Sequence, residues 1–167
     1  SYRLINYTGT LTGSASNIAL GTLPGVPPNS AVVQTAVPGQ VNLITFNGLA
    51  ANFWDGPNTS SNGAVNGGTG TWNDTTSNWT NASGTFNQSY IPGLAIFQGV
   101  AGTVTIGAPV SANVIQFSTD GYVVTGASPL TLLSQSGVQP GLIRVDAGVT
   151  ATIVITQLIA SATAASP

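Results

Sequence analysis

Short runs of alternating apolar and polar residues dominate the second half of the chain. In residues 103–106 two aliphatic side chains alternate with two threonines, and Gly102 and Gly107 bound the run. A period of two residues is typical of a strand that buries one face. Further runs of β-branched and aliphatic residues predict strands over 114–117, 122–124, 130–133, 142–145 and 150–155. Glycine and proline recur between them, so we expect short strands joined by tight turns and little helix.

The first half of the chain is less regular. Residues 4–11 and 41–46 are predicted strands, whereas residues 21–38 carry four prolines and are expected to be irregular. Residues 58–70 consist of Gly, Asn, Ser and Thr with almost no apolar residue besides Val65, which predicts an exposed loop. We expect residues 1–167 to form one domain that contains this irregular segment and this loop.

The spacing of the predicted strands fits two architectures. Strands that start about 8 to 12 residues apart are typical of an antiparallel β-sandwich or barrel. Three such strands would also make one coil of roughly 25 to 30 residues in a parallel β-solenoid, in which each coil buries its apolar side against the next. Periodicity alone leaves both possibilities open.

Charged residues make up only 4% of the chain, which contains no Lys, Glu, His or Cys. The two arginines, Arg3 and Arg144, lie far apart in sequence, so no basic surface is expected for nucleic acid. Disulfides, thiolate metal sites and catalysis by a His-activated Ser or Cys are excluded. We therefore expect no cofactor, no metal and no catalytic residue.

Membrane and targeting signals are also missing from this sequence. The most apolar tail, residues 151–165, is interrupted by Thr, Ser and Gln, so no stretch reaches the length of a membrane-spanning helix. The chain begins at Ser1 without a basic and then apolar segment, from which we expect a mature chain or a fragment of a longer protein.

Several short strings resemble the strand repeats of bacterial autotransporter passenger regions. In order, they occupy residues 7–13, 20–24, 39–43, 54–56, 70–73, 78–80, 101–105, 115–117 and 120–122. Examples are YTGTLTG at 7–13 and AGTVT at 101–105. Each string is short and occurs in many proteins. In this order and at this spacing, however, the strings extend over most of the chain. The prolines between residues 24 and 38 interrupt the repeat.

The resemblance implies an all-β fold, a right-handed parallel β-helix (β-solenoid), with an antiparallel β-sandwich as the alternative. It further implies export through the outer membrane by a type V system, with a C-terminal β-barrel outside this chain, and a location outside the cell or on the bacterial surface. The implied role is that of a structural or adhesive module related to virulence. Its partners would be a host surface protein, a glycan or another copy of itself.

The alternative function is binding or cleavage of a polysaccharide on a β-helix. Two carboxylates about 5 to 10 Å apart would be needed for cleavage, and Asp55 and Asp74 are the pair that flanks the tryptophans. We favour structural or solvated roles for the aspartates. Asp120 precedes Gly121 in a predicted turn, and Asp146 lies two residues from Arg144.

The three tryptophans of the chain lie close together in sequence, among Asn, Thr, Asp and Gly. Flat rings beside amide and hydroxyl groups suit stacking on sugar rings, and tryptophan also anchors protein interfaces. The competing role, which we favour, is filling the core. The candidate ligand-binding residues are Trp54, Asp55, Trp72, Asn73, Asp74 and Trp79.

Overall fold

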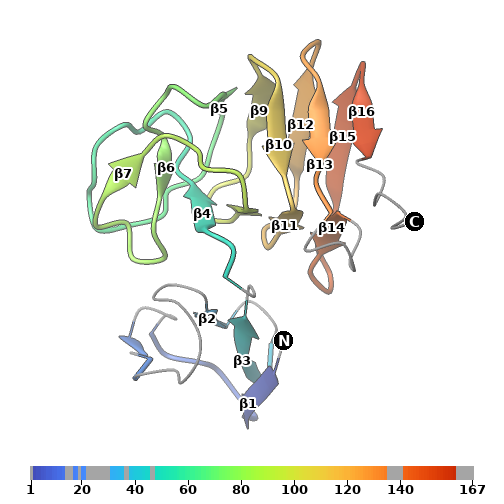
Figure 1. The fold of residues 1–167 in the computed structure, drawn as a ribbon. Coiled ribbons are helices and arrows are strands. Elements are labelled where there is room, and N and C mark those ends of the chain that lie inside the picture. Colours follow the sequence, from blue (N-terminus) through green and yellow to red (C-terminus); the bar gives the residue numbers. More distant parts are fainter. Residues whose placement is uncertain are drawn as a thin grey trace.

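The computed structural model describes residues 2–13, 17–18, 20–21, 31–35, 38–45, 48–134 and 141–160. Within this part all sixteen elements are strands, and they form four sheets (Figure 1). The strands expected around 103–106, 114–117, 122–124, 130–133, 142–145 and 150–155 are confirmed, with bounds that differ by at most two residues. The all-β prediction is therefore confirmed.

The N-terminal sheet is antiparallel, with the order β1-β3-β2. It consists of β1 (Tyr2–Asn6), β2 (Ala31–Gln34) and β3 (Gln40–Thr45). The strand expected over 4–11 thus begins earlier and ends at Asn6. Strand β2 lies in the segment 21–38 that was expected to be irregular, whereas residues 22–30 and 36–37 of that segment lie outside the described residues.

Three sheets built largely from parallel strands form the rest of the structure. The six-stranded sheet has the order β14-β11-β8-β4-β6-β7, with β4 (Ala51–Trp54), β6 (Trp79–Thr80), β7 (Asn87–Gln88), β8 (Leu94–Phe97), β11 (Val114–Phe117) and β14 (Leu142–Val145). The four-stranded sheet has the order β15-β12-β9-β5, with β5 (Gly70–Trp72), β9 (Thr103–Ile106), β12 (Tyr122–Gly126) and β15 (Ala151–Ile155). The third sheet has the order β10-β13-β16, with β10 (Val110–Ala112), β13 (Leu130–Leu132) and β16 (Leu158–Ala160).

From β8 onward the chain passes through these three sheets in the same order three times. We call each passage a circuit: β8 to β10 is the first, β11 to β13 the second and β14 to β16 the third. Leu94 pairs with Val114, and Val114 pairs with Leu142, so these three residues hold the same position in successive circuits. The interval from Val114 to Leu142 fits the coil length expected for a solenoid, whereas the interval from Leu94 to Val114 is shorter than expected.

The pairing between circuits is parallel throughout. Among the described strands, antiparallel pairing is confined to the N-terminal sheet and to β4, β6 and β7. An antiparallel β-sandwich, the alternative left open by strand spacing, does not have this pairing. Parallel neighbours require a long return of the chain, which the two other strands of each circuit provide.

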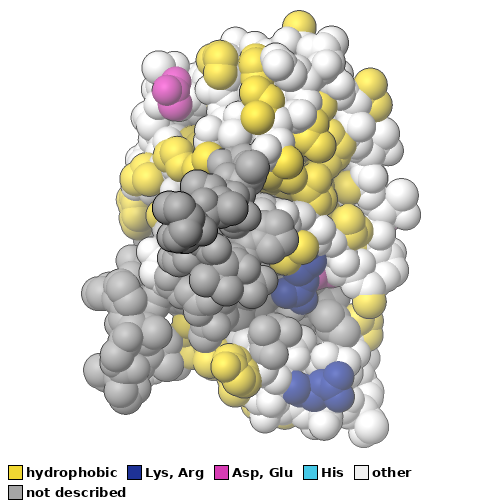
Figure 2. All heavy atoms as spheres, turned by 45° about the vertical axis from the view of Figure 1, so that its right-hand side comes forward, with side chains coloured by type: hydrophobic (Ala, Val, Ile, Leu, Met, Phe, Trp, Pro, Cys, Tyr) yellow, Lys and Arg dark blue, Asp and Glu magenta, His cyan; other side chains and the backbone are white. Residues whose placement is uncertain are grey.

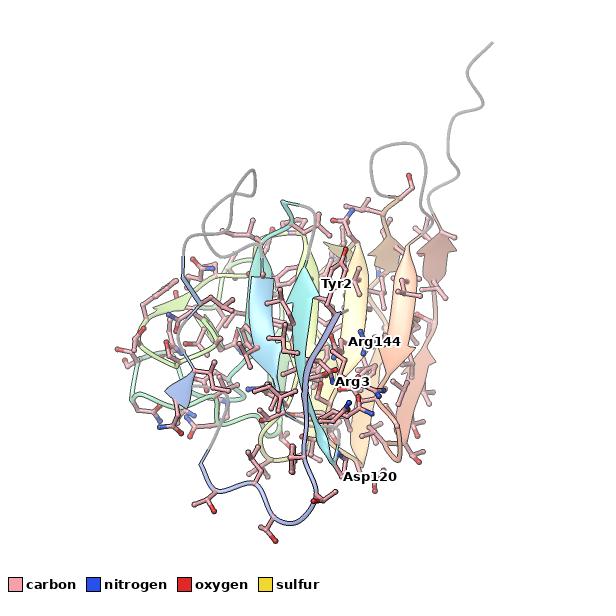
Figure 3. The ribbon with its side chains drawn as sticks, turned by 90° about the horizontal axis from the view of Figure 1, so that it is seen from below. Tyr2, Arg3, Asp120 and Arg144 are labelled. Carbon is pink, nitrogen blue, oxygen red and sulfur yellow. The ribbon has the colours of Figure 1, made fainter. Side chains whose placement is uncertain are left out.

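Strand β8 is buried on both faces, and its sequence LAIF shows no alternation as a result. Ala95 and Phe97 face the main core, whereas Leu94 and Ile96 belong to a second cluster on the opposite face together with Phe53. The N-terminal sheet lies below the parallel sheets in Figure 1 and on the near side in Figure 3, where Arg3 and Arg144 are both visible. The six-stranded sheet thus packs against the main core with one face of β8 and against a second apolar cluster with the other face.

Gly67 permits a close approach between residues 65–69 and the first circuit. Its φ is 69°, and an added Cβ would clash with the carbonyl oxygens of Gln98 and Val100. We expect Gly67→Ala to lower the free energy of unfolding by about 1 to 3 kcal/mol, because it adds this clash to the strain of a left-handed residue. Urea denaturation measures the change.

Gly63→Ala is the matched control, since Gly63 also has a positive φ, 78°, but no atom within 4 Å of an added Cβ. The free energy of unfolding of this variant should fall by only about 1 kcal/mol, which is the strain of a left-handed residue that carries a Cβ. An equal loss of unfolding free energy in the two variants would contradict the clash at Gly67.

In the part of the chain that the structure describes, no helix is long and apolar enough to cross a membrane.

Candidate functional site

The three tryptophans form one buried aromatic cluster at the β4 end of the circuits. Trp54, Trp72 and Trp79 are each 0% exposed. The ring centroid of Trp79 lies 5.1 Å from that of Trp54, 5.3 Å from that of Trp72 and 4.7 Å from that of Tyr90. Phe97 of β8 joins the cluster, 5.6 Å from both Trp72 and Trp79. The core role that we favoured for the tryptophans is confirmed by this burial.

Local pairing explains why the rings meet. Strand β6 pairs antiparallel with β4, which places Trp79 opposite Trp54, and β5 places Trp72 beside Ile106 of β9. The Trp54 indole N–H donates to the Gly68 carbonyl at 2.7 Å. Among the described residues the buried indole N–H groups of Trp72 and Trp79 have no protein hydrogen-bond partner.

Asp55 is a buried carboxylate surrounded by amides. It is 0% exposed, and its Oδ1 accepts hydrogen bonds from the Asn66 backbone N–H at 2.7 Å and from the Asn66 side-chain amide at 3.2 Å. Its Oδ2 accepts from the Asn87 amide at 2.9 Å. A buried carboxylate is costly unless donors surround it, and here three donors do so. Asp55 therefore ties residues 66 and 87 to the end of β4.

Sequence reasoning selected Asp55 but not its partners Asn66 and Asn87. These asparagines are two of many in the chain, and no spacing sets them apart. A third amide, Asn78, donates to the carbonyls of Gly56 and Thr71, both at 3.0 Å, and so joins the segment that follows β4 to strand β5.

Asn73 organises the turn between β5 and β6. Its Oδ1 accepts from the backbone N–H of Thr75 at 3.0 Å and from that of Thr76 at 2.7 Å. Such turns, closed by an asparagine side chain, fix a loop without strand pairing. Asp74 is exposed at the tip of this turn, and Asn73 is partly exposed. Of the six candidate residues, only these two present accessible side chains, and ligand contact at either stays a prediction.

We define the loop surface as the exposed residues of 59–64, 74–75 and 82–86. Two of its loops touch, because the Gly63 N–H donates to the Gly84 carbonyl at 2.9 Å. Asn81 closes the third turn by accepting from the Thr85 N–H at 2.9 Å. The loop surface is hydroxyl- and amide-rich, with Asp74 as its one charged residue and Phe86, 45% exposed, as its one large apolar residue. Within the segment 58–70, residues 59–64 are exposed, whereas residues 65–68 are partly or fully buried.

Asp55 and Asp74 do not share an accessible groove. The first is fully buried and accepts three hydrogen bonds, whereas the second is exposed. A carboxylate closed off from solvent does not reach a glycosidic oxygen, so this pair does not provide the two carboxylates of a glycosidase. No group of three or more His, Cys, Asp or Glu side chains that could hold a metal ion occurs among the described residues.

The remaining aspartates have the structural roles that we expected. Asp120 accepts from the Thr150 N–H at 2.7 Å and so joins the second circuit to the third. Asp146 is 6% exposed and pairs with Arg144 at 3.3 Å. It also accepts from the Gln34 amide at 2.6 Å, which connects the N-terminal sheet to the third circuit.

The outer face of the four-stranded sheet carries in-register rows of β-branched residues. Strand pairing places Thr71, Thr105, Thr125 and Val154 in one row, and Thr103, Val123 and Thr152 in another. Thr103, Thr105 and Thr152 are exposed. Rows of like residues suit a parallel sheet with an uncharged surface. We call this surface the threonine face.

Tyr122 connects the aromatic core to the loops. Its hydroxyl donates to the Gln98 carbonyl at 2.7 Å and accepts from the Gly68 N–H at 3.4 Å. Burial raises the pKa of Tyr122 to about 12, and the Gly68 hydrogen bond offsets part of that shift. The phenol is therefore neutral at physiological pH and acts as a fixed hydrogen-bonding group.

The sequence is 46% identical over 157 residues to a protein of Brucella suis biovar 1 (strain 1330) named Adhesin BmaC autotransporter. The match covers 90% of this chain and 4% of that protein, so the chain corresponds to a small piece of its relative. It confirms the resemblance to autotransporters that the repeat strings predicted. No protein-family model matches the sequence, and no solved structure matches it.

Proposed function

We propose that this chain is a segment of the exported passenger of an autotransporter adhesin, displayed on the bacterial surface or released from it. The observation that carries the proposal is the 46% identity over 90% of the chain to an autotransporter named as an adhesin. In this role the chain is structural and adhesive, not catalytic. The absence of His, Cys, Lys and Glu, together with the buried Asp55, agrees with that role.

The passenger segment is a right-handed parallel β-solenoid in this proposal. Its support is the threefold repetition of the same path through three sheets, with parallel pairing at every step. Parallel crossovers are right-handed in nearly all proteins. Such a solenoid holds its loops at a distance from the cell and exposes them repeatedly along its length.

The loop surface is the contact surface for the ligand, which is a host surface protein or a glycan. Its neutral hydroxyl and amide groups suit hydrogen bonding to either class, and Phe86 adds an exposed apolar contact. The tryptophans and Asp55 act indirectly, because they hold the loops in place. Asn73 and Asp74 are the candidate residues that meet the ligand directly.

Binding of the purified chain to immobilised extracellular-matrix proteins and to a glycan array tests this function. For any ligand detected, we expect the double variant Asp74→Lys, Phe86→Ala to lower affinity at least about tenfold, since both residues are exposed on the loop surface. The circular-dichroism spectrum should not change, because neither side chain is in the core.

Thr105→Ala, on the threonine face, is the control and should bind as the unmodified chain does. Equal affinity of the loop variant would place the contact elsewhere. Absence of binding to both panels would remove the support for an adhesive role of this segment.

A further inference from the structure

Strand β1 is an edge strand that is exposed along its whole length. It ends the N-terminal sheet, and no strand among the described residues pairs with its outer side. All of its side chains are exposed, among them Tyr2 at 65%, Leu4 at 50% and Ile5 at 52%. Unpaired backbone N–H and C=O groups along such an edge are a template for a further strand. We call this outer side of β1 the β1 edge.

A β-bulge divides the side chains of β1 between an apolar face and a polar face. The register of β1 against β3 shifts at Leu4, which is the extra residue. Because cross-strand partners share a face, this shift places Tyr2 and Ile5 on one face and Arg3 and Asn6 on the other. A strand that pairs with the β1 edge therefore needs aliphatic residues on one face and polar residues on the other. The cross-strand pairs are Tyr2 with Leu43, Arg3 with Asn42, Ile5 with Val41 and Asn6 with Gln40.

The charge of Arg3 restricts the partner further. Among the described residues no carboxylate pairs with Arg3, whereas Arg144 pairs with Asp146 at 3.3 Å. Figure 2 shows both arginines, which are the only Lys or Arg residues of the chain, on one face of the molecule. Opposite charges on neighbouring strands stabilise their pairing, and like charges weaken it. A complementary strand thus carries an acidic residue on its polar face, beside Arg3.

A second copy of this chain does not supply that acidic residue. Pairing of β1 with another β1 would bring two Arg3 side chains and no carboxylate to one short strand pair. Charged residues and bulges on edge strands are known devices against pairing between identical edges, and the β1 edge has both. They disfavour self-association while they leave the edge open to a strand of different sequence.

We propose that the β1 edge binds an extended acidic peptide segment of a partner protein, which adds to the N-terminal sheet as a fourth strand. Main-chain hydrogen bonds to β1 provide the affinity, and a carboxylate beside Arg3 provides the selectivity. This interface uses other residues than the loop surface and goes beyond the adhesive contact proposed there. A second copy of this chain and the parent sequence that precedes residue 1 are the competing occupants.

NMR titration of the isotope-labelled chain with three short peptides tests the proposal. Each peptide alternates Val and Thr, and its central Thr is replaced by Glu, by Gln or by Lys. We expect saturable shifts of the β1 amide signals with the Glu peptide, an affinity about threefold lower with the Gln peptide and the lowest affinity with the Lys peptide. Unchanged β1 signals with all the peptides, or equal affinity for the Glu and Lys peptides, would overturn the proposal.

Two variants of Asn6 test pairing through the backbone. The Tyr7 N–H donates to the Gly39 carbonyl at 3.0 Å, on the side of β3, so the N–H of Asn6 points to the β1 edge. Asn6→Pro removes this donor and should lower the affinity for the Glu peptide at least about tenfold. Asn6→Ala keeps the N–H and should bind as the unmodified chain does. Equal affinity of the two variants would contradict strand addition at β1.

Charge reversal at Arg3 tests the selectivity. Arg3→Glu should reverse the order of the peptides, so that the Lys peptide binds best, because the carboxylate then needs a cation beside it. Arg3 is exposed, so the circular-dichroism spectrum should not change. A variant that still preferred the Glu peptide would show that Arg3 does not select the partner.

Sedimentation equilibrium and a longer chain separate the occupants. We expect the chain to be monomeric without peptide, and a dimer that Asn6→Pro breaks would assign the β1 edge to a second copy. Since the chain corresponds to 4% of the length of its relative, a version extended by the parent sequence that precedes residue 1 is also tested, and it should still bind the Glu peptide. Loss of binding in that version would assign the edge to the parent polypeptide. Either result would overturn the proposal, whereas failure to bind matrix proteins or glycans would count against the adhesive role of the loop surface alone.

Discussion

Replacing Trp79 with alanine is expected to lower the free energy of unfolding by about 3 to 5 kcal/mol, one of the two largest single effects in this chain. Trp79 is 0% exposed, and its ring contacts those of Trp54, Trp72, Tyr90 and Phe97. The substitution leaves a cavity that strands β4 and β6 border on one side, and removes the edge-to-face contact with Trp54. Urea denaturation followed by far-ultraviolet circular dichroism measures the loss.

Phe86→Ala is the control for Trp79→Ala, because Phe86 lies nearby in the same segment of the chain but is 45% exposed. Its effect on stability should stay within about 0.5 kcal/mol. If Trp79→Ala kept the unfolding midpoint of the unmodified chain and lost ligand binding, the ring would be a ligand contact and our assignment of it to the core would be wrong.

Asp55→Ala is expected to lower the free energy of unfolding by about 2 to 3 kcal/mol, because it leaves partly buried donors without their acceptor and not because it opens a large cavity. The three donors that lose the Asp55 acceptor are one backbone N–H and two side-chain amides, of which the Asn87 amide still donates to the Asn58 carbonyl. Each buried donor that loses its partner costs about 1 to 3 kcal/mol. Residues 58–70 should also become more sensitive to proteases, since the Asn66 anchor that holds their C-terminal half is lost. Urea denaturation and limited proteolysis measure the two effects.

Two further variants separate hydrogen bonding from charge at this position. Asp55→Asn keeps the volume and one acceptor oxygen, so its loss of stability should be smaller than that of Asp55→Ala. Asp74→Ala removes an exposed carboxylate and should change stability by less than about 0.5 kcal/mol. Equal unfolding midpoints for Asp55→Ala and Asp74→Ala would show that the amide network around Asp55 is not stabilising.

The fold class could be predicted from the sequence wherever one face of a strand meets solvent. The alternation of Thr103–Ile106 matches its burial, which runs exposed, buried, exposed, buried. Strand β8 was not predicted because Leu94–Phe97 is buried on both faces and therefore does not alternate. Strands β5, β6 and β7 are too short, with two or three residues each, for any period to appear.

Some properties of the candidate site can likewise be predicted from the sequence, whereas others depend on the tertiary structure. The sequence shows that three tryptophans and two aspartates lie close together along the chain. It does not show which of them reach solvent, because that depends on how β4, β5 and β6 come together in space. The partners of Asp55 are 11 and 32 residues away, and only folding brings them to it.

By itself, the sequence determined that this protein is built from short strands, carries almost no charge and lacks the His and Cys residues that His- or Cys-based catalysis needs. These properties follow from residue types and their period, which are local. Tertiary structure decided that the strands of successive circuits pair in parallel, that the tryptophans are buried and that, within the described residues, the third circuit lies at the edge of all three parallel sheets. Each of these depends on contacts between residues far apart in sequence, and the same alternating pattern suits a sandwich and a solenoid equally well.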